Sequence, residues 1–164
     1  MTDDIPAAIP AAIPTDSPAD SPADTLRSVE LSRIGPARFK ATNARGGETF
    51  FGTGGEDPDF TPVELLLAAI AGCSALDVEA ITHKHTSSTT FDVRAEGHKV
   101  RDEHGNHMTG LRVSFAVDFP DGPEGDKARD RLERAIEMSR DRLCTVSRTV
   151  QLGEEVVYEP VSDR

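Results

Sequence analysis

An apolar, alanine-rich segment, TPVELLLAAIAGCSALDVEAI at residues 61–81, narrows the possible folds of this chain more than any other part of the sequence. Thr61 has the side chain of a helix N-cap, Pro62 suits the first helical position, and Glu64 stands three residues after the cap, as in a capping box. These signals predict a helix from about Pro62 to Ile81. Because its first half is apolar on every face, we expect this helix in the centre of a core or in an extensive subunit contact.

The chain has two cysteines, Cys73 inside this segment and Cys144 much later. Glycine inside a helix costs roughly 1 kcal/mol relative to alanine, so Gly72 predicts that a substrate channel or a crossing helix approaches the backbone closely. The pair of cysteines points to thiol redox chemistry. Composition alone favours the simpler interpretation that both are small buried hydrophobic residues, as is common for free cysteine.

The rest of the chain predicts strands before this helix, and then strands, a second helix and strands, which is an α+β fold. Residues 25–55 predict short strands and turns, with a turn at NARGG (residues 43–47). Alternating apolar residues predict strands at 91–95 and 111–119, joined by the turn RDEHGNH. After DGPEG, apolar spacings of three and four predict a second helix that ends near Cys144. The following segment, TVSRTVQLGEEVVYEP, predicts one or two further strands.

The sequence divides into two regions. Residues 1–24 repeat Pro-Ala-Ala-Ile and Ser-Pro-Ala-Asp units. Regularly placed prolines break helices and sheet ladders alike, so we expect a disordered, acidic, Pro/Ala-rich tail. The chain of 164 residues is long enough for one domain with a real core, which we assign to residues 25–164.

Composition argues against several classes of protein. With 29 acidic and 18 basic residues the formal charge is −11, which disfavours nucleic acid or an anionic membrane as a partner. Two cysteines are too few for a disulfide-stapled secreted scaffold. We find no signal-peptide pattern, and expect no apolar run near the roughly 20 residues that cross a bilayer. The expected location is therefore the cytoplasm.

The histidines do not predict a metal site. His83 and His85 follow the first helix, and His104 and His107 lie in the RDEHGNH turn. Neither pair has a third ligand at a recognisable spacing. The loop GTGGEDPDF lacks the lysine of a phosphate-binding loop. We expect neither a metal nor another cofactor.

The helix segment around Cys73, together with the later cysteine in SRDRLCTVSRTV, resembles the osmotically inducible protein C and organic hydroperoxide resistance family (OsmC/Ohr). The similarity is greatest to its OsmC-like branch and covers roughly Val29 to Tyr158. The resemblance implies an OsmC-like fold, in which antiparallel sheets pack around two main helices and two protomers intertwine as a homodimer. It also implies reduction of organic hydroperoxides by a pair of cysteines.

In that chemistry Cys73 must ionise, because a thiolate attacks a peroxide and a neutral thiol scarcely does. Burial raises a thiol pKa, and a position inside a helix is far from its N-terminus. A nearby cation is therefore required. The resemblance favours Arg45, in the NARGG turn, and Arg38 is the competing candidate. We expect the pKa of Cys73 to lie well below that of a free thiol.

Glu64 has two possible roles. The peroxide-reducing relatives use a glutamate directly after the proline to orient the arginine, but here Val63 occupies that place. At about 100° per residue, Glu64 and Cys73 project from roughly opposite helix faces. A role as the capping acid is therefore at least as well supported as an arginine contact.

The resemblance implies a cofactor-free thiol peroxidase. Cys73 attacks an organic hydroperoxide and becomes a sulfenic acid, Cys144 condenses with it to a disulfide, and an external dithiol reduces that bond. An apolar wall that favours alkyl or lipid peroxides is expected from Phe39, Leu65, Leu66 and Ile70. The alternative is a non-catalytic OsmC-like homodimer that binds an apolar ligand or partner in the same cleft. The substitution at Val63 favours this alternative.

Overall fold

The computed structural model describes residues 25–160, so the predicted tail at residues 1–24 lies outside the described part of the chain. Three strands precede the first helix, a two-stranded hairpin follows it, and the second half is helical. The elements are β1 (Val29–Gly35), β2 (Arg38–Asn43), β3 (Glu48–Phe51), α2 (Pro62–Thr82), β4 (Thr90–Asp102), β5 (Gly105–Asp118), α3 (Pro123–Met138), the π-helical turn η1 (Ser139–Leu143) and α4 (Thr145–Leu152). The predicted α+β class is confirmed, with a third helix, α4, beyond the two expected.

Helix α2 begins with the predicted capping box. The Glu64 amide donates to Thr61 Oγ1 at 3.3 Å, and Glu64 Oε2 accepts from the Thr61 amide at 2.7 Å. The helix ends at Thr82, one residue beyond the prediction. Its buried residues recur at every fourth position, so they form one stripe along the helix: Ile70, Ser74, Val78 and Thr82.

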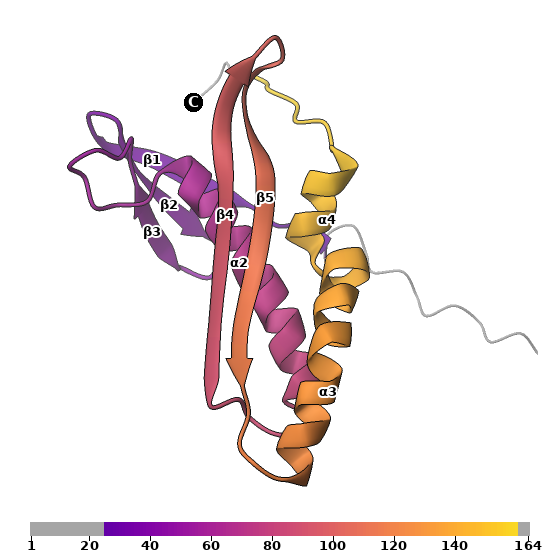
Figure 1. Cartoon of the computed structure of the whole chain (residues 1–164). Helices are drawn as coiled ribbons and strands as arrows, with labels where there is room; N and C mark the ends of the chain where they lie inside the picture. The colour runs from indigo at the N-terminus through magenta and orange to yellow at the C-terminus, as the bar shows by residue number, and fades with distance from the viewer. Residues whose placement is uncertain (1–24, 161–164) are drawn as a thin grey trace, which may run out of the picture.

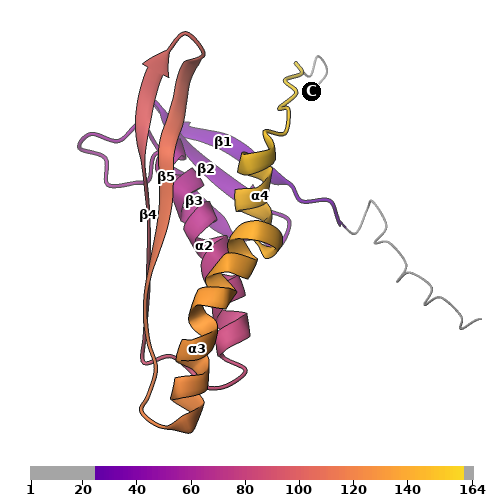
Figure 2. The same ribbon diagram turned by 45° about the vertical axis from the view of Figure 1, so that its right-hand side comes forward.

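The strands form two antiparallel sheets. Strands β1, β2 and β3 make a meander in that order, with the predicted NARGG turn between β2 and β3. Strands β4 and β5 form one long hairpin. Helix α2 contacts β4 on one side and α3 on the other (Figures 1 and 2). This arrangement places the middle of α2 opposite the junction of α3, η1 and α4.

The C-terminal segment differs from the prediction. Residues predicted as strands form α4, which ends at Gly153 in a left-handed conformation with φ of 67°. The segment is rich in β-branched residues, which favour strands when no neighbour decides otherwise. Here α4 packs against α2 and η1, and this tertiary contact overrides the local preference. Residues 154–160 form neither helix nor strand.

Helix α2 also corrects the expectation about apolar runs. By length and composition alone, its 21 residues could cross a membrane. The core helix of a soluble protein passes the same test. In this fold α2 contacts α3, β4 and α4, and 22% of its most apolar window is buried.

Candidate thiol site

The fold brings the two cysteines together. The sulfurs of Cys73 and Cys144 and a carboxylate oxygen of Asp77 all lie within 4.8 Å of one another. Both cysteines are free thiols, Cys73 partly exposed and Cys144 0% exposed. Two residues far apart in the sequence therefore form one site between α2 and the η1–α4 junction.

The π-helical turn η1 positions Cys144. The Cys144 amide donates to the Ser139 carbonyl at 3.0 Å, five residues back, which closes the wide turn. Cys144 then leaves the helical conformation, with ψ of 98°, and serves as the N-cap of α4. Single π-helical turns inside helices are frequent at functional sites. Here the turn directs the Cys144 sulfur toward α2.

Hydrogen bonds surround the Cys144 sulfur. Ser74 Oγ donates to Sγ at 3.4 Å, the Ser147 amide donates at 3.4 Å, and Ser147 Oγ lies 3.1 Å away. Burial opposes ionisation of this thiol, but hydrogen bonds from Ser147, Ser74 and Cys73 stabilise the thiolate. Together they bring the pKa of Cys144 below its ordinary value.

The Cys73 thiol is affected in the opposite direction. Burial is the main reason that the pKa of Cys73 is raised. A hydrogen bond from the Val146 backbone lowers this pKa, but the neighbouring Cys144 and Asp77 raise it further. No arginine or lysine of residues 25–160 is among these causes. The expectation of a lowered pKa for Cys73 is therefore wrong in this structure, because burial disfavours the thiolate and the neighbouring Cys144 and Asp77 disfavour it further.

Asp77 is a site residue that the sequence analysis missed. Its Oδ2 accepts a hydrogen bond from Ser139 Oγ at 2.9 Å, so α2 and η1 are joined beside the two sulfurs. Asp77 follows Cys73 by four residues, and that spacing places both side chains on one helix face. This signal was available in the sequence, whereas the contact with Ser139 depends on the tertiary structure.

Neither arginine considered from the sequence contacts the thiols. Arg45 lies exposed in the β2–β3 turn, where its amide donates to Asn43 Oδ1 at 2.9 Å. Arg38 forms ion pairs with Asp57, at 3.1 Å from its Nε, and with Asp59. An activating role for either arginine stays a prediction.

Glu64 occupies the capping role. Hydrogen bonds from the Thr61 amide and hydroxyl to its carboxylate lower the pKa of Glu64. Within residues 25–160 Glu64 contacts neither sulfur and pairs with no arginine. A catalytic role for this residue stays a prediction.

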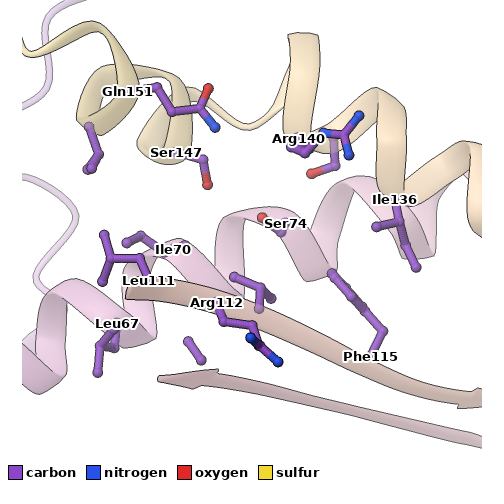
Figure 3. Close-up of a pocket in the computed structure, with 14 residues that line it drawn as sticks. Leu67, Ile70, Ser74, Leu111, Arg112, Phe115, Ile136, Arg140, Ser147 and Gln151 are labelled. Atoms are coloured by element: carbon purple, nitrogen blue, oxygen red, sulfur yellow. The ribbon is translucent and has the colours of Figure 1, made fainter. Parts of the chain in front are cut away.

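An apolar pocket of about 320 Å³ adjoins the thiol site. Its wall includes the three serines that bond to Cys144 or Asp77. It also includes two arginines that the sequence analysis did not single out, Arg112 and Arg140 (Figure 3). Of the predicted apolar wall, Ile70 lines this pocket and Phe39, Leu65 and Leu66 do not. The main lining residues are Leu67, Ile70, Ser74, Leu111, Arg112, Phe115, Ile136, Ser139, Arg140 and Ser147.

The histidines lie apart from this site. His83 Nδ1 is 3.3 Å from Ser87 Oγ, and His107 Nδ1 is 3.7 Å from Asp102. Within the described part of the chain, the group of three possible metal ligands consists of the two cysteines and Asp77 and contains no histidine.

Comparison with known proteins identifies the family. The family model described as "OsmC-like protein" matches residues 54–159. An uncharacterised protein of Mycobacterium tuberculosis is 28% identical over 132 residues, which span 80% of this chain and 93% of that protein. Among solved structures, an OsmC-like protein from Mycoplasma pneumoniae has a TM-score of 0.64 at 11% identity, covering 78% of this chain and 89% of that one.

A second solved structure, an organic hydroperoxide resistance protein OsmC from Legionella pneumophila, has a TM-score of 0.53 at 14% identity. It covers 77% of this chain and 89% of that chain. At these identities the two structures establish the fold. The family model matches more than half of the sequence, and the chain therefore belongs to the OsmC-like protein family.

Proposed function

We propose that this protein reduces organic hydroperoxides with Cys73 and Cys144 as its redox pair. The observation that carries the proposal is the approach of the two sulfurs, which lie within 4.8 Å of each other beside an apolar pocket. The family gives further support, because a solved structure with this fold is described as an organic hydroperoxide resistance protein. The reaction needs an external dithiol, which suits the reducing cytoplasm that we propose as its location.

In the proposed mechanism the two thiols share one proton before the reaction. The charge is more stable on Cys144, while Cys73 is the more exposed residue. Transfer of the Cys73 proton to Cys144 places the thiolate where a peroxide can reach it. The Cys73 thiolate then attacks the terminal peroxide oxygen, so that an S–O bond forms, the O–O bond breaks and the alkoxide takes a proton from water.

The second thiol completes the reaction. Cys144 attacks the Cys73 sulfenic acid, water leaves and a disulfide forms, so that two electrons have passed from the thiols to the peroxide. The sulfurs must approach from at most 4.8 Å to the disulfide length of about 2.0 Å, which requires a local adjustment of the η1–α4 junction. Exchange with the external dithiol restores both thiols.

We also propose that the chain functions as a homodimer. Helix α2 leaves an apolar face exposed next to Cys73, and the space around Gly72 is open. The predicted close approach at Gly72 is therefore absent within the described part of one protomer. A second protomer would cover this face and could bring a cation toward the thiols.

A direct test uses metal-free protein in the presence of a chelator, with cumene hydroperoxide as substrate and dithiothreitol as reductant. Removing the attacking thiol in Cys73→Ser should lower peroxide consumption at least a hundredfold. Cys144→Ser should stop the reaction at the sulfenic acid, which dimedone traps for mass spectrometry. One equivalent of peroxide should convert the wild type into the intramolecular disulfide.

Arg45→Ala should reduce turnover on the order of a hundredfold if Arg45 is the activating cation.

A second candidate is a non-catalytic binder of an apolar ligand in the same pocket. The raised pKa of Cys73 and the anionic surroundings of that thiol favour it. Consumption of peroxide by the wild type at the rate of a Cys73→Ser, Cys144→Ser double variant would contradict the peroxidase proposal. Binding of an apolar fluorescent probe by both the wild type and the double variant would then support the non-catalytic function.

A further inference from the structure

The thiol site also contains the donor atoms of a metal centre. Two cysteine sulfurs and one carboxylate oxygen converge from two separate parts of the chain. Thiolates select zinc and other soft or borderline ions, while Mg²⁺ and Ca²⁺ prefer sites made of oxygen ligands only. The ligand types therefore favour Zn²⁺ among the common divalent ions.

The distances fit such an ion. Ligands about 2.0–2.3 Å from a tetrahedral zinc ion lie roughly 3.3–3.8 Å from one another. The three ligand atoms here already lie within 4.8 Å of one another. Each separation therefore needs to contract by at most about 1.0–1.5 Å. Two of the three ligands, Cys73 and Asp77, lie one turn apart on the same rigid helix.

Neighbouring hydrogen bonds orient the ligands. Ser139 donates to Oδ2 of Asp77, which leaves the other oxygen available. Ser74 Oγ and the Ser147 amide hold the Cys144 sulfur from two sides. Such outer contacts fix ligand geometry in metal sites. Within residues 25–160 no lysine or arginine pairs with Asp77, so the cluster has no competing cation.

We propose that the reduced protein binds one Zn²⁺ per chain through Cys73 Sγ, Cys144 Sγ and one carboxylate oxygen of Asp77. Three protein ligands leave the fourth tetrahedral position for water or another small ligand. Each sulfur can either coordinate the ion or form the Cys73–Cys144 disulfide. Zinc binding and the disulfide therefore exclude each other. The proposal uses the same thiols as the peroxidase reaction but does not require peroxidase activity.

The test is a zinc titration of tag-free, metal-free, phosphine-reduced protein against a chromophoric chelator, without peroxide. The wild type should retain one zinc per chain. Cys73→Ser and Cys144→Ser should each weaken binding at least a hundredfold, and Asp77→Asn should weaken it about tenfold or more. Glu79→Gln, a charge change on the exposed side of the same helix, and His107→Ala are matched controls that should bind as the wild type does.

Cobalt substitution of the wild type tests the ligands without any mutation. Co²⁺ should give thiolate-to-metal charge-transfer absorption and the intense visible bands of a tetrahedral ion. Absence of binding by the wild type, wild-type affinity in either serine variant, unchanged affinity in Asp77→Asn, or an octahedral cobalt spectrum would overturn the proposed site. Because no peroxide is present, failure of the peroxidase proposal would leave these results unchanged.

Discussion

Cys144 caps helix α4 with its own sulfur, an uncommon choice of capping atom. The Ser147 amide donates to Sγ from inside the helix, and the Ser74 hydroxyl donates from the opposite helix, both at 3.4 Å. Hydrogen bonds to a charged acceptor are stronger than those to a neutral one, so these donors favour the thiolate over the thiol. The Cys73 thiol, in contrast, lies near the carboxylate of Asp77, which disfavours its thiolate. We therefore infer that Cys144 ionises first, although it is the more buried residue.

At this scale we predict that Ser147→Ala raises the pKa of Cys144. The change removes the hydroxyl that stabilises the thiolate but leaves the capping amide in place. Alkylation of each cysteine, followed by mass spectrometry across pH in the presence of a chelator, should show the Cys144 inflection moving to higher pH. Thr149→Ala is the control, because that hydroxyl bonds to the Thr145 carbonyl. Equal inflections in wild type and Ser147→Ala would contradict the role of the hydroxyl.

At the scale of elements, the start of α2 fixes the position of the reactive helix. The capping box joins Thr61 and Glu64 by reciprocal hydrogen bonds, and Pro62 takes the first helical position. These contacts satisfy amides that the first turn of a helix otherwise leaves unpaired. The same contacts lower the pKa of Glu64, so its charged form stabilises the fold.

The corresponding prediction concerns stability. Thr61→Ala should lower the free energy of unfolding by about 1 kcal/mol, the usual value of an N-cap side chain. Glu64→Gln should be less stable than wild type at neutral pH. Because the native pKa of Glu64 lies below 4.5, this difference should persist above 4.5 and fade as the pH falls through the native pKa. Urea unfolding at one protein concentration measures both effects, and a pH-independent difference for Glu64→Gln would contradict the charge effect.

At the scale of the whole molecule, one protomer leaves much of its central helix uncovered. Leu76, one turn from Cys73, is 69% exposed, and Ala68, Ala69 and Gly72 are exposed on the same helix. A large apolar patch that stays in water is uncommon in monomers and marks interaction surfaces. This exposure supports the proposed homodimer, with α2 at the contact.

We predict that Leu76→Asp converts the proposed dimer into folded monomers. A carboxylate in an apolar contact loses its hydration without gaining a partner, which disfavours association. Light scattering after size exclusion should show the mass of one chain, and circular dichroism should show retained helix. Leu26→Asp is a matched control, because Leu26 is 71% exposed and lies far from α2 in the sequence. A wild type that runs as a monomer, or an unchanged mass for Leu76→Asp, would contradict an interface at this face.

The sequence by itself determined the elements whose signals are local. The start of α2 was predictable because the capping residues and the apolar run are adjacent in the chain. The β4–β5 hairpin was predictable because alternation of apolar residues continues on both sides of one turn. The motif around Cys73 was also sufficient for the family, since residues 54–159 match its model.

Only the tertiary structure decided the conformation after Cys144 and the properties of the two thiols. The β-branched residues of α4 favour a strand locally, but packing against α2 and capping by the Cys144 sulfur stabilise a helix. The order of thiol acidity depends on burial and on donors and charges that reach each sulfur through space. Ser74, Ser147 and Asp77 come from separate elements, so no spacing along the chain could rank Cys73 against Cys144.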